Sequence, residues 1–165
     1  MGRDKQATAA IEVRAASATM QLKKGGRLCI PADVLKILGW KGPPQAVKLI
    51  AELVTPGYVK LYKRDAIEEK LEVKRAKLAK EAAVGDSEAL KKLKVFVDRY
   101  RPVSLQKEKR VHLTESVIVF LGARPKDLPY FFIQAANCRD EVEIMSIDKR
   151  DELMEELGED EDVAL

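Results

Sequence analysis

The chain has 165 residues, 46% of them hydrophobic and 5% aromatic, which suits one domain or two small ones with a mostly aliphatic core. Two isolated cysteines, Cys29 and Cys138, exclude a disulfide framework and a cysteine-based metal site. There is neither a signal-peptide pattern nor a run of about 18 apolar residues, so we expect a cytoplasmic protein with no membrane partner.

Charge is distributed unevenly along the chain, although the net charge is only +3. Residues 1–110 contain 25 Lys and Arg against 13 Asp and Glu, whereas residues 111–165 contain 5 against 14. A basic first part is typical of a polyanion-binding surface, and an acidic end is typical of a solvating or regulatory tail. Both could also be ordinary solvated faces, and charge alone favours nucleic acid only slightly.

The first part of the chain predicts an arm, two short strands and a short helix. Residues 1–18 are small and polar, and we expect a flexible basic arm there. The sequence MQLKKGGRLCIP predicts strands over 20–23 and 27–30 around a glycine turn. Pro31 suits the first turn of a helix over 32–38, and a glycine follows that helix where left-handed backbone is favoured.

A hairpin and a charged helix come next. Strands over 46–54 and 59–64 flank the turn sequence TPGY. Asp65 and Glu68 have the spacing of a capping box and predict the start of a helix over 65–83.

A second charged helix is predicted after the sequence VGDS. Asp86 or Ser87 is expected to cap it, and it should end before Pro102. Leu90, Leu93 and Phe96 or Val97 have helical spacing and predict a stripe that faces the core. The run of bases and acids at 70–80 in the preceding helix could follow a nucleic-acid backbone, but a solvated face is the simpler interpretation.

The rest of the chain resembles its opening. KRVHLTESVIVFLG at 109–122 aligns with GRLCIPADVLKILG at 26–39 with an offset of 83. KRDELMEEL at 149–157 aligns with KRDAIEEKL at 63–71 with an offset of 86, and the three extra residues fit a loop. Two matches in the same order predict an internal duplication of a β–β–α–β–β–α unit.

We therefore predict an α+β fold in which two tandem β–β–α–β–β–α repeats form one pseudo-dimeric, double-psi-like barrel with flanking helices. Neither repeat can build much core alone, so the two should pack together. The predicted divisions are a flexible basic N-terminal arm at 1–18, a first repeat with its helix at 19–84, a linking helix and second repeat at 85–157, and an acidic tail at 158–165.

The GRLCIP strand at 26–31 resembles the swapped-hairpin DNA-binding domains of the AbrB superfamily, whose members carry a G-R-(apolar, polar, apolar)-P strand. Two such copies joined by a charged helix resemble the MraZ family of transcriptional regulators, and this resemblance covers residues 20–157. The resemblance implies a swapped-hairpin barrel, binding to DNA and assembly into rings.

Several positions depart from the family pattern. Lys23 stands where the family has an acidic residue, and Leu35 stands where it has an arginine. In the second copy Gln106 replaces the acidic residue, Lys109 the glycine and Thr114 the proline. The first copy is therefore the better candidate for DNA contact.

The candidate DNA-binding residues surround the two Gly-Arg positions. Glycines let a turn approach a groove closely, clustered bases neutralise phosphates, and the planar fork of arginine suits the edge of guanine. Arg27 could alternatively pair with an acidic neighbour and brace the hairpin, and both possibilities are retained. The full candidate set is Arg14, Lys23, Lys24, Gly25, Gly26, Arg27, Lys107, Lys109 and Arg110.

Three further features have ordinary structural interpretations. His112 is the only histidine and has no partner for catalysis or metal binding, so we expect a structural role. Trp40 could stack on a base, but such a residue more often fills the end of a small core. The acidic tail is expected to be disordered; the alternative is a mimic that competes with DNA for the patch at 23–27.

The sequence contains no P-loop string, catalytic triad or metal cluster, so we expect no enzyme activity, no cofactor and no small-molecule substrate. The expected function is that of a sequence-selective, nucleoid-associated transcriptional regulator that represses by occlusion. Its expected partners are double-stranded DNA and other copies of itself, because a homo-oligomer would strengthen weak contacts with short repeated sites. The alternative is a non-enzymatic assembly or protein-interaction module whose second repeat has degenerated.

Overall fold

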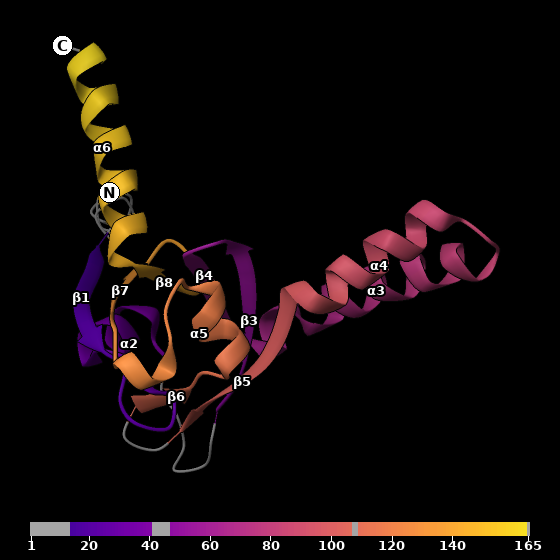
Figure 1. Cartoon of the computed structure of the whole chain (residues 1–165), viewed down its shortest axis with the longest axis horizontal. Coiled ribbons are helices and arrows are strands. Elements are labelled where there is room, and N and C mark those ends of the chain that lie inside the picture. The colour runs from indigo at the N-terminus through magenta and orange to yellow at the C-terminus, as the bar shows by residue number, and fades with distance from the viewer. Residues whose placement is uncertain (1–13, 41–46, 107–108, 165) are drawn as a thin grey trace, which may run out of the picture.

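The structure, a computed structural model, describes residues 14–40, 47–106 and 109–164 (Figure 1). The first half contains β1 (Ala15–Gln21), β2 (Arg27–Cys29), α2 (Ala32–Leu38), β3 (Val47–Thr55), β4 (Tyr58–Lys63) and α3 (Arg64–Ala83). After α4 (Ser87–Arg99), the second half contains β5 (Tyr100–Gln106), β6 (Arg110–His112), α5 (Glu115–Phe120), the 3-10 helix η2 (Pro125–Asp127), β7 (Tyr130–Ala136), β8 (Glu141–Ser146) and α6 (Ile147–Ala164).

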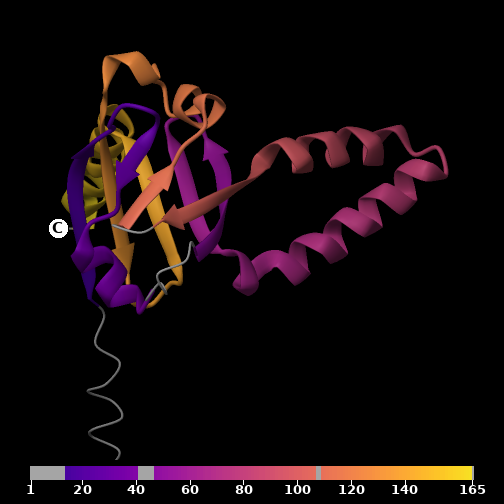
Figure 2. The same cartoon turned by 90° about the horizontal axis from the view of Figure 1, so that it is seen from below.

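Eight antiparallel strands form one sheet that curls into a nearly closed barrel, in the order β1-β7-β8-β4-β3-β5-β6-β2 (Figures 1 and 2). The predicted α+β class is confirmed. Strand β1 of the first half pairs with β7 of the second, from Ala15 opposite Ala136 to Gln21 opposite Tyr130. Strand β5 of the second half pairs with β3 of the first. Each half therefore supplies an outer strand to the hairpin of the other.

The same order of elements occurs twice, and from β2 and β6 onward the corresponding elements share one offset, whereas β5 begins 85 residues after β1. Strand β6 begins 83 residues after β2, β7 begins 83 after β3, β8 begins 83 after β4, and α6 begins 83 after α3. The predicted offset of 86 for the KRD segments is therefore wrong. Lys63 ends strand β4, whereas Lys149 lies inside helix α6. The match reflects the similar charged composition of two exposed helix starts, not equivalent positions.

Two predicted boundaries also shift. Strand β1 begins at Ala15, inside the predicted flexible arm, because the partner strand β7 supplies a hydrogen-bonding ladder that the sequence alone does not reveal. Helix α3 begins at Arg64, and the preceding Lys63 gives it no side-chain cap. Glu68 does not close a capping box; it forms an ion pair with Arg64 at 2.9 Å, one helical turn away.

The core lies inside the barrel and is mostly aliphatic, as predicted. Alternate residues of each strand point inward, and the ends are closed by α2, α5 and Trp40. Val34 and Leu35 of α2 and Val117 and Ile118 of α5 are buried. These equivalent helices therefore close the core in the same way in both halves.

Helices α3 and α4 form a hairpin arm that projects away from the barrel (Figures 1 and 2). The N-terminus of α4 is capped as predicted, because the Asp86 carboxylate accepts from the backbone N–H groups of Glu88 and Ala89 at 3.0 and 3.1 Å. The predicted core-facing stripe is wrong for two of its members. Phe96 is buried and Leu93 is half-buried, but Leu90 and Val97 are 43% and 55% exposed, because the arm leaves the barrel instead of covering it.

Helix α6 begins directly after β8 and projects from the barrel in another direction (Figure 1). It continues to Ala164, so residues 158–164 are helical and the prediction of a disordered tail is wrong for them. These residues extend a helix that is already nucleated at the barrel, so continuing it requires no new nucleus. Among the described residues, no helix combines the length and hydrophobicity that a membrane span requires.

Candidate nucleic-acid interface

Strands β2 and β6 bring the Gly26-Arg27 segment and the Lys109-Arg110 segment side by side. They pair antiparallel, with Arg27 opposite His112 and Cys29 opposite Arg110. The pairing extends beyond the strands, because the Leu113 N–H donates to the Gly26 carbonyl at 2.7 Å and the Ile30 N–H donates to the Lys109 carbonyl at 2.7 Å. These two hydrogen bonds join equivalent positions of the two halves, so the site has a local two-fold arrangement.

The segment 23–27 is a tight turn held by its own backbone. The Lys23 N–H donates to the Arg27 carbonyl at 2.7 Å, and the Gly26 N–H donates to the Lys23 carbonyl at 3.2 Å. Gly25 and Gly26 have φ values of 85° and 75°, in the left-handed region that favours glycine. The turn leaves Lys23, Lys24 and Arg27 exposed to solvent.

The two glycines of this turn have different surroundings. Gly25 is exposed, and a Cβ added to it would meet nothing within 4 Å. Gly26 is buried, and a Cβ there would lie 2.4 Å from the carbonyl oxygen of Leu113. Gly26 therefore allows β2 to approach β6, while Gly25 keeps the exposed surface of the turn free of a side chain.

Lys109 occupies the position equivalent to Gly26 and has a φ of 62°, which is unfavourable for a residue with a side chain. Replacing Lys109 by glycine should raise the free energy of unfolding by about 0.5–1 kcal/mol, because the relief of strain exceeds the added entropy of the unfolded chain. Urea denaturation measures the change. Lys24→Gly is the control, because Lys24 is an exposed lysine without a positive φ, and this change should destabilise the protein. Equal effects of the two changes would contradict the prediction.

No acidic side chain in the described part of the chain forms an ion pair with Arg27, so the bracing alternative gains no support from the structure. Arg27 is exposed. His112, expected to be structural, is also exposed and lies opposite Arg27 across the strand pair. The offset of 83 makes it equivalent to Cys29, but only the β2–β6 register places it beside Arg27.

The other candidate DNA-binding residues do not all lie beside the turn. Lys109 is exposed and Arg110 is half-buried, and both lie on β6 or directly before it, beside the turn. Arg14 lies at the far end of β1, nine residues and roughly 30 Å of extended chain from the start of the turn, so the structure does not bring it to the site. Its backbone N–H donates to the Asn137 side chain at 2.8 Å. Lys107 lies outside the described residues.

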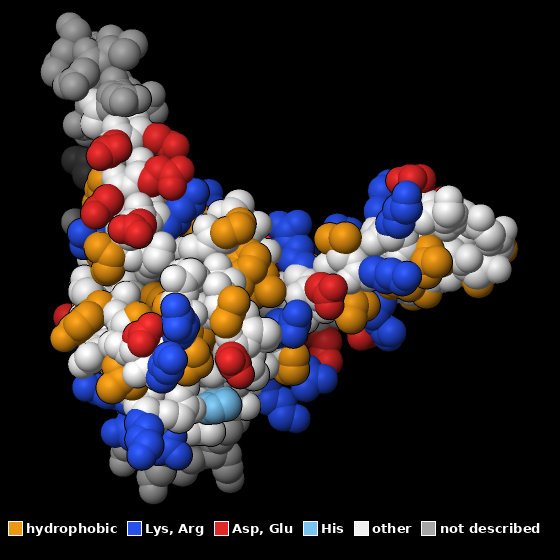
Figure 3. Space-filling model, viewed as in Figure 1, with side chains coloured by type: hydrophobic (Ala, Val, Ile, Leu, Met, Phe, Trp, Pro, Cys, Tyr) orange, Lys and Arg blue, Asp and Glu red, His pale blue; other side chains and the backbone are white. Residues whose placement is uncertain are grey.

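Charges of opposite sign gather on different parts of the molecule (Figure 3). Lys and Arg side chains cluster at the end of the barrel where β6 lies, and another group follows the α3–α4 arm. Acidic side chains gather on α6, which leaves the opposite end of the barrel in this view. Competition between α6 and DNA for the turn at 23–27 of the same chain is therefore disfavoured by their separation.

Trp40 does not stack at the surface. It is only 4% exposed, belongs to the core, and donates a hydrogen bond from its indole Nε1 to the carboxylate of Asp140. The amino group of Lys63 lies over the Trp40 ring, 5.9 Å from its centre. The prediction that Trp40 fills the end of the core is confirmed.

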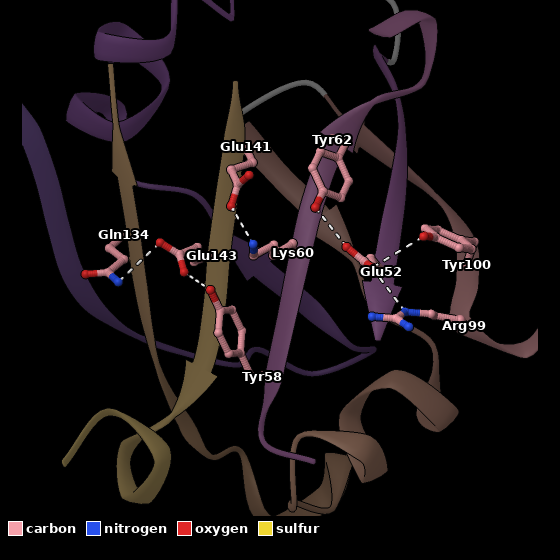
Figure 4. A network of polar contacts seen from close by, with 9 residues as sticks. All are labelled: Glu52, Tyr58, Lys60, Tyr62, Arg99, Tyr100, Gln134, Glu141 and Glu143. Atoms are coloured by element: carbon pink, nitrogen blue, oxygen red, sulfur yellow. Dashed lines mark hydrogen bonds and ion pairs between the residues drawn. The ribbon is translucent and has the colours of Figure 1, made fainter. Parts of the chain in front are cut away.

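A second polar cluster lies on the outer face of β7, β8, β4 and β3 (Figure 4). The contacts form three groups. Glu143 accepts hydrogen bonds from Gln134 and Tyr58, and Lys60 forms an ion pair with Glu141. Glu52 accepts hydrogen bonds from Tyr62 and Tyr100 and forms an ion pair with Arg99. Burial raises the pKa of Glu143, and burial together with the hydrogen bond to Glu52 raises the pKa of Tyr62. The cluster joins neighbouring strands and the base of the arm, which is a structural role.

Within the described ranges, His, Cys, Asp and Glu side chains form no group of three or more that could hold a metal ion. The polar groups around the turn at 23–27 are backbone amides, lysines and arginine, which suit an anionic ligand. No protein-family model and no curated protein sequence matches the chain. Assignment to the MraZ family therefore stays a prediction.

Proposed function

We propose that this protein is a sequence-selective, DNA-binding transcriptional regulator built from two tandem swapped-hairpin repeats. The observation that carries the proposal is the antiparallel pairing of β2 with β6, beside which Lys23, Lys24, Arg27 and Lys109 are exposed. No acidic side chain among the described residues neutralises these four by an ion pair. Such a group of bases attracts the phosphate backbone of a duplex.

The roles of the residues differ in this proposal. Lys23, Lys24 and Lys109 contact phosphates, which contributes affinity without sequence information. Arg27 reads a base edge, because its guanidinium can donate two parallel hydrogen bonds to guanine. The exposed Gly25 lets the turn approach the duplex without a side chain in the way. One such turn binds weakly, so several copies in a nucleoid-associated homo-oligomer occupy adjacent short repeats and exclude polymerase.

The test is binding of the wild type and of Lys24→Ala/Arg27→Ala to random-sequence duplex DNA over a series of salt concentrations. The wild type should bind with affinity that falls steeply with salt. The variant should bind more weakly, with a slope smaller by about 0.9, because the Lys24 phosphate contact is lost while Arg27 is assigned to a base edge. Fluorescence anisotropy of labelled duplex measures both quantities.

Lys80→Ala/Lys94→Ala is the matched control, because it removes two positive charges from exposed positions on the arm. The control should keep the wild-type slope. Selection of duplexes from a random library should then enrich a short repeated motif, and Arg27→Ala alone should relax it. Absence of binding at low salt would reject the proposal.

A second candidate function, a protein-assembly module, is favoured by a different observation. The α3–α4 arm and helix α6 leave the barrel and expose apolar side chains such as Val95, Val97, Met154 and Leu157. Such side chains rarely gather on projecting elements without a partner. Assembly and DNA binding are compatible, because they use different parts of the molecule.

A further inference from the structure

The arm carries an apolar groove between its two helices, close to the barrel. The groove has a volume of about 320 Å³. Leu78 of α3, Val95 and Phe96 of α4, and Tyr100 supply its apolar surface. Its charged side chains are all basic: Lys74, Lys91, Lys92 and Arg99. The groove therefore suits an apolar ligand that carries negative charge.

The floor of the groove is held in place by aromatic and polar contacts. The rings of Phe96 and Tyr100 lie 5.0 Å apart, and the amino group of Lys74 lies 5.6 Å from the centre of the Phe96 ring. Glu52 of β3 forms an ion pair with Arg99 at 3.0 Å and accepts a hydrogen bond from Tyr100 at 3.3 Å (Figure 4). These contacts fix the base of the arm on the barrel, so the groove is formed before any ligand arrives.

Helix α6 has the complementary chemistry. Leu153, Met154 and Leu157 follow the spacing of one helical face, and Met154 and Leu157 are 57% and 60% exposed. Over residues 147–164 the sequence contains nine acidic and two basic residues. Glu152, placed among the apolar positions, and Glu155 are exposed. This edge borders a hollow over Phe132 and Met145 of its own barrel and is still exposed. An acidic helix with an exposed apolar edge is a ligand of the class that the groove suits.

Within one chain the two elements do not meet. Helix α6 packs on β7 and β8, and it leaves the barrel in a different direction from the arm (Figures 1 and 2). A second copy of the chain can supply the missing partner for each. The contact is then heterologous, because groove and helix are different surfaces of the same molecule.

We propose that helix α6 of one copy binds in the α3–α4 groove of the next copy. The apolar edge at Leu153, Met154 and Leu157 covers the groove floor, and the acidic side chains of α6 meet the lysines at its rim. Apolar burial supplies the affinity, and the charges select the register and direction of the helix. Repetition of a head-to-tail contact of this kind builds a closed ring or an open filament.

The test measures the mass of the full chain in solution by sedimentation velocity and light scattering, in the absence of DNA. The wild type should be larger than the 18.5 kDa monomer. Lys91→Glu/Lys92→Glu places acids at the groove rim and should weaken association at least about tenfold. Lys80→Glu/Lys94→Glu makes the same change of charge on the same arm, with one substitution on α3 and one on α4 at positions that do not line the groove, and it should keep the wild-type mass.

A second pair of variants excludes misfolding as the cause. Glu155→Lys/Glu156→Lys should also weaken association, because it makes helix α6 basic. When the two defective variants are mixed, an acidic groove meets a basic helix and a basic groove meets an acidic helix, so the mixture should regain the wild-type mass. Far-UV circular dichroism of each variant should match the wild type.

A monomeric wild type overturns the proposal, and so does an unchanged mass for Lys91→Glu/Lys92→Glu. An equal loss of mass in the arm control, or a mixture that stays monomeric, also overturns it. If Lys91→Glu/Lys92→Glu keeps its mass but loses affinity for DNA, the groove binds nucleic acid instead. The measurement contains no DNA, so its outcome is independent of the DNA-binding proposal.

Discussion

Replacing Gly26 by alanine is expected to lower the free energy of unfolding by about 3–4 kcal/mol. The left-handed backbone at Gly26, with a φ of 75°, costs alanine about 1–2 kcal/mol. In addition, the new Cβ would lie 2.4 Å from the Leu113 carbonyl oxygen, which is backbone and cannot rotate away. Strands β2 and β6 must then separate and lose the hydrogen bond from the Leu113 N–H to the Gly26 carbonyl.

Gly25→Ala is the matched control, because Gly25 has a φ of 85° but no atom within 4 Å of the added Cβ. Only the conformational cost applies, so the loss should be about 1–2 kcal/mol. Urea unfolding followed by circular dichroism gives both values. Equal losses would show that the close approach of β2 and β6 does not limit the size of residue 26.

Replacing Trp40 by alanine is expected to cost about 3–5 kcal/mol, as is usual when a large buried aromatic side chain is removed. Trp40 is 4% exposed and packs in the core at the end of helix α2. Its indole N–H donates to Asp140, which precedes β8 on the other half of the chain. The substitution therefore leaves a cavity and removes a contact between the halves.

Trp40→Phe separates these two contributions, because phenylalanine keeps most of the apolar volume but cannot donate to Asp140. Its expected cost is about 1–2 kcal/mol. Unfolding should be followed by circular dichroism, since Trp40 is the single tryptophan and its fluorescence disappears with it. A Trp40→Ala variant with unchanged stability and weaker DNA binding would contradict the core assignment and restore base stacking.

Local chemistry in the sequence predicted many of the elements. The hairpin β3–β4, the short helix α2 and the cap of α4 at Asp86 follow from alternation, helical spacing and turn residues, which act over a few residues. The start of β1 could not be predicted in this way. Its Ala- and Ser-rich sequence has little strand preference, and it becomes a strand because β7 lies beside it.

The candidate interface was predicted only in part. The turn at 23–27 could be identified from its glycines and bases, because turn chemistry is local. The sequence did not indicate that His112 lies opposite Arg27, or that Arg14 lies at the far end of β1, because both facts depend on strand pairing. The apolar groove of the arm was also missed, since the stripe at 90–97 has the same spacing whether it faces a core or solvent.

The sequence by itself determined the α+β class, the repeated order of elements and the basic turn, since periodicity, proline, glycine and charge act locally. Only the tertiary structure decided the exchange of outer strands between the halves, the 83-residue offset of the elements from β2 and β6 onward, and the juxtaposition of β2 with β6. Strand pairing and burial couple residues that are far apart in the chain, so a pattern read along the chain cannot specify them.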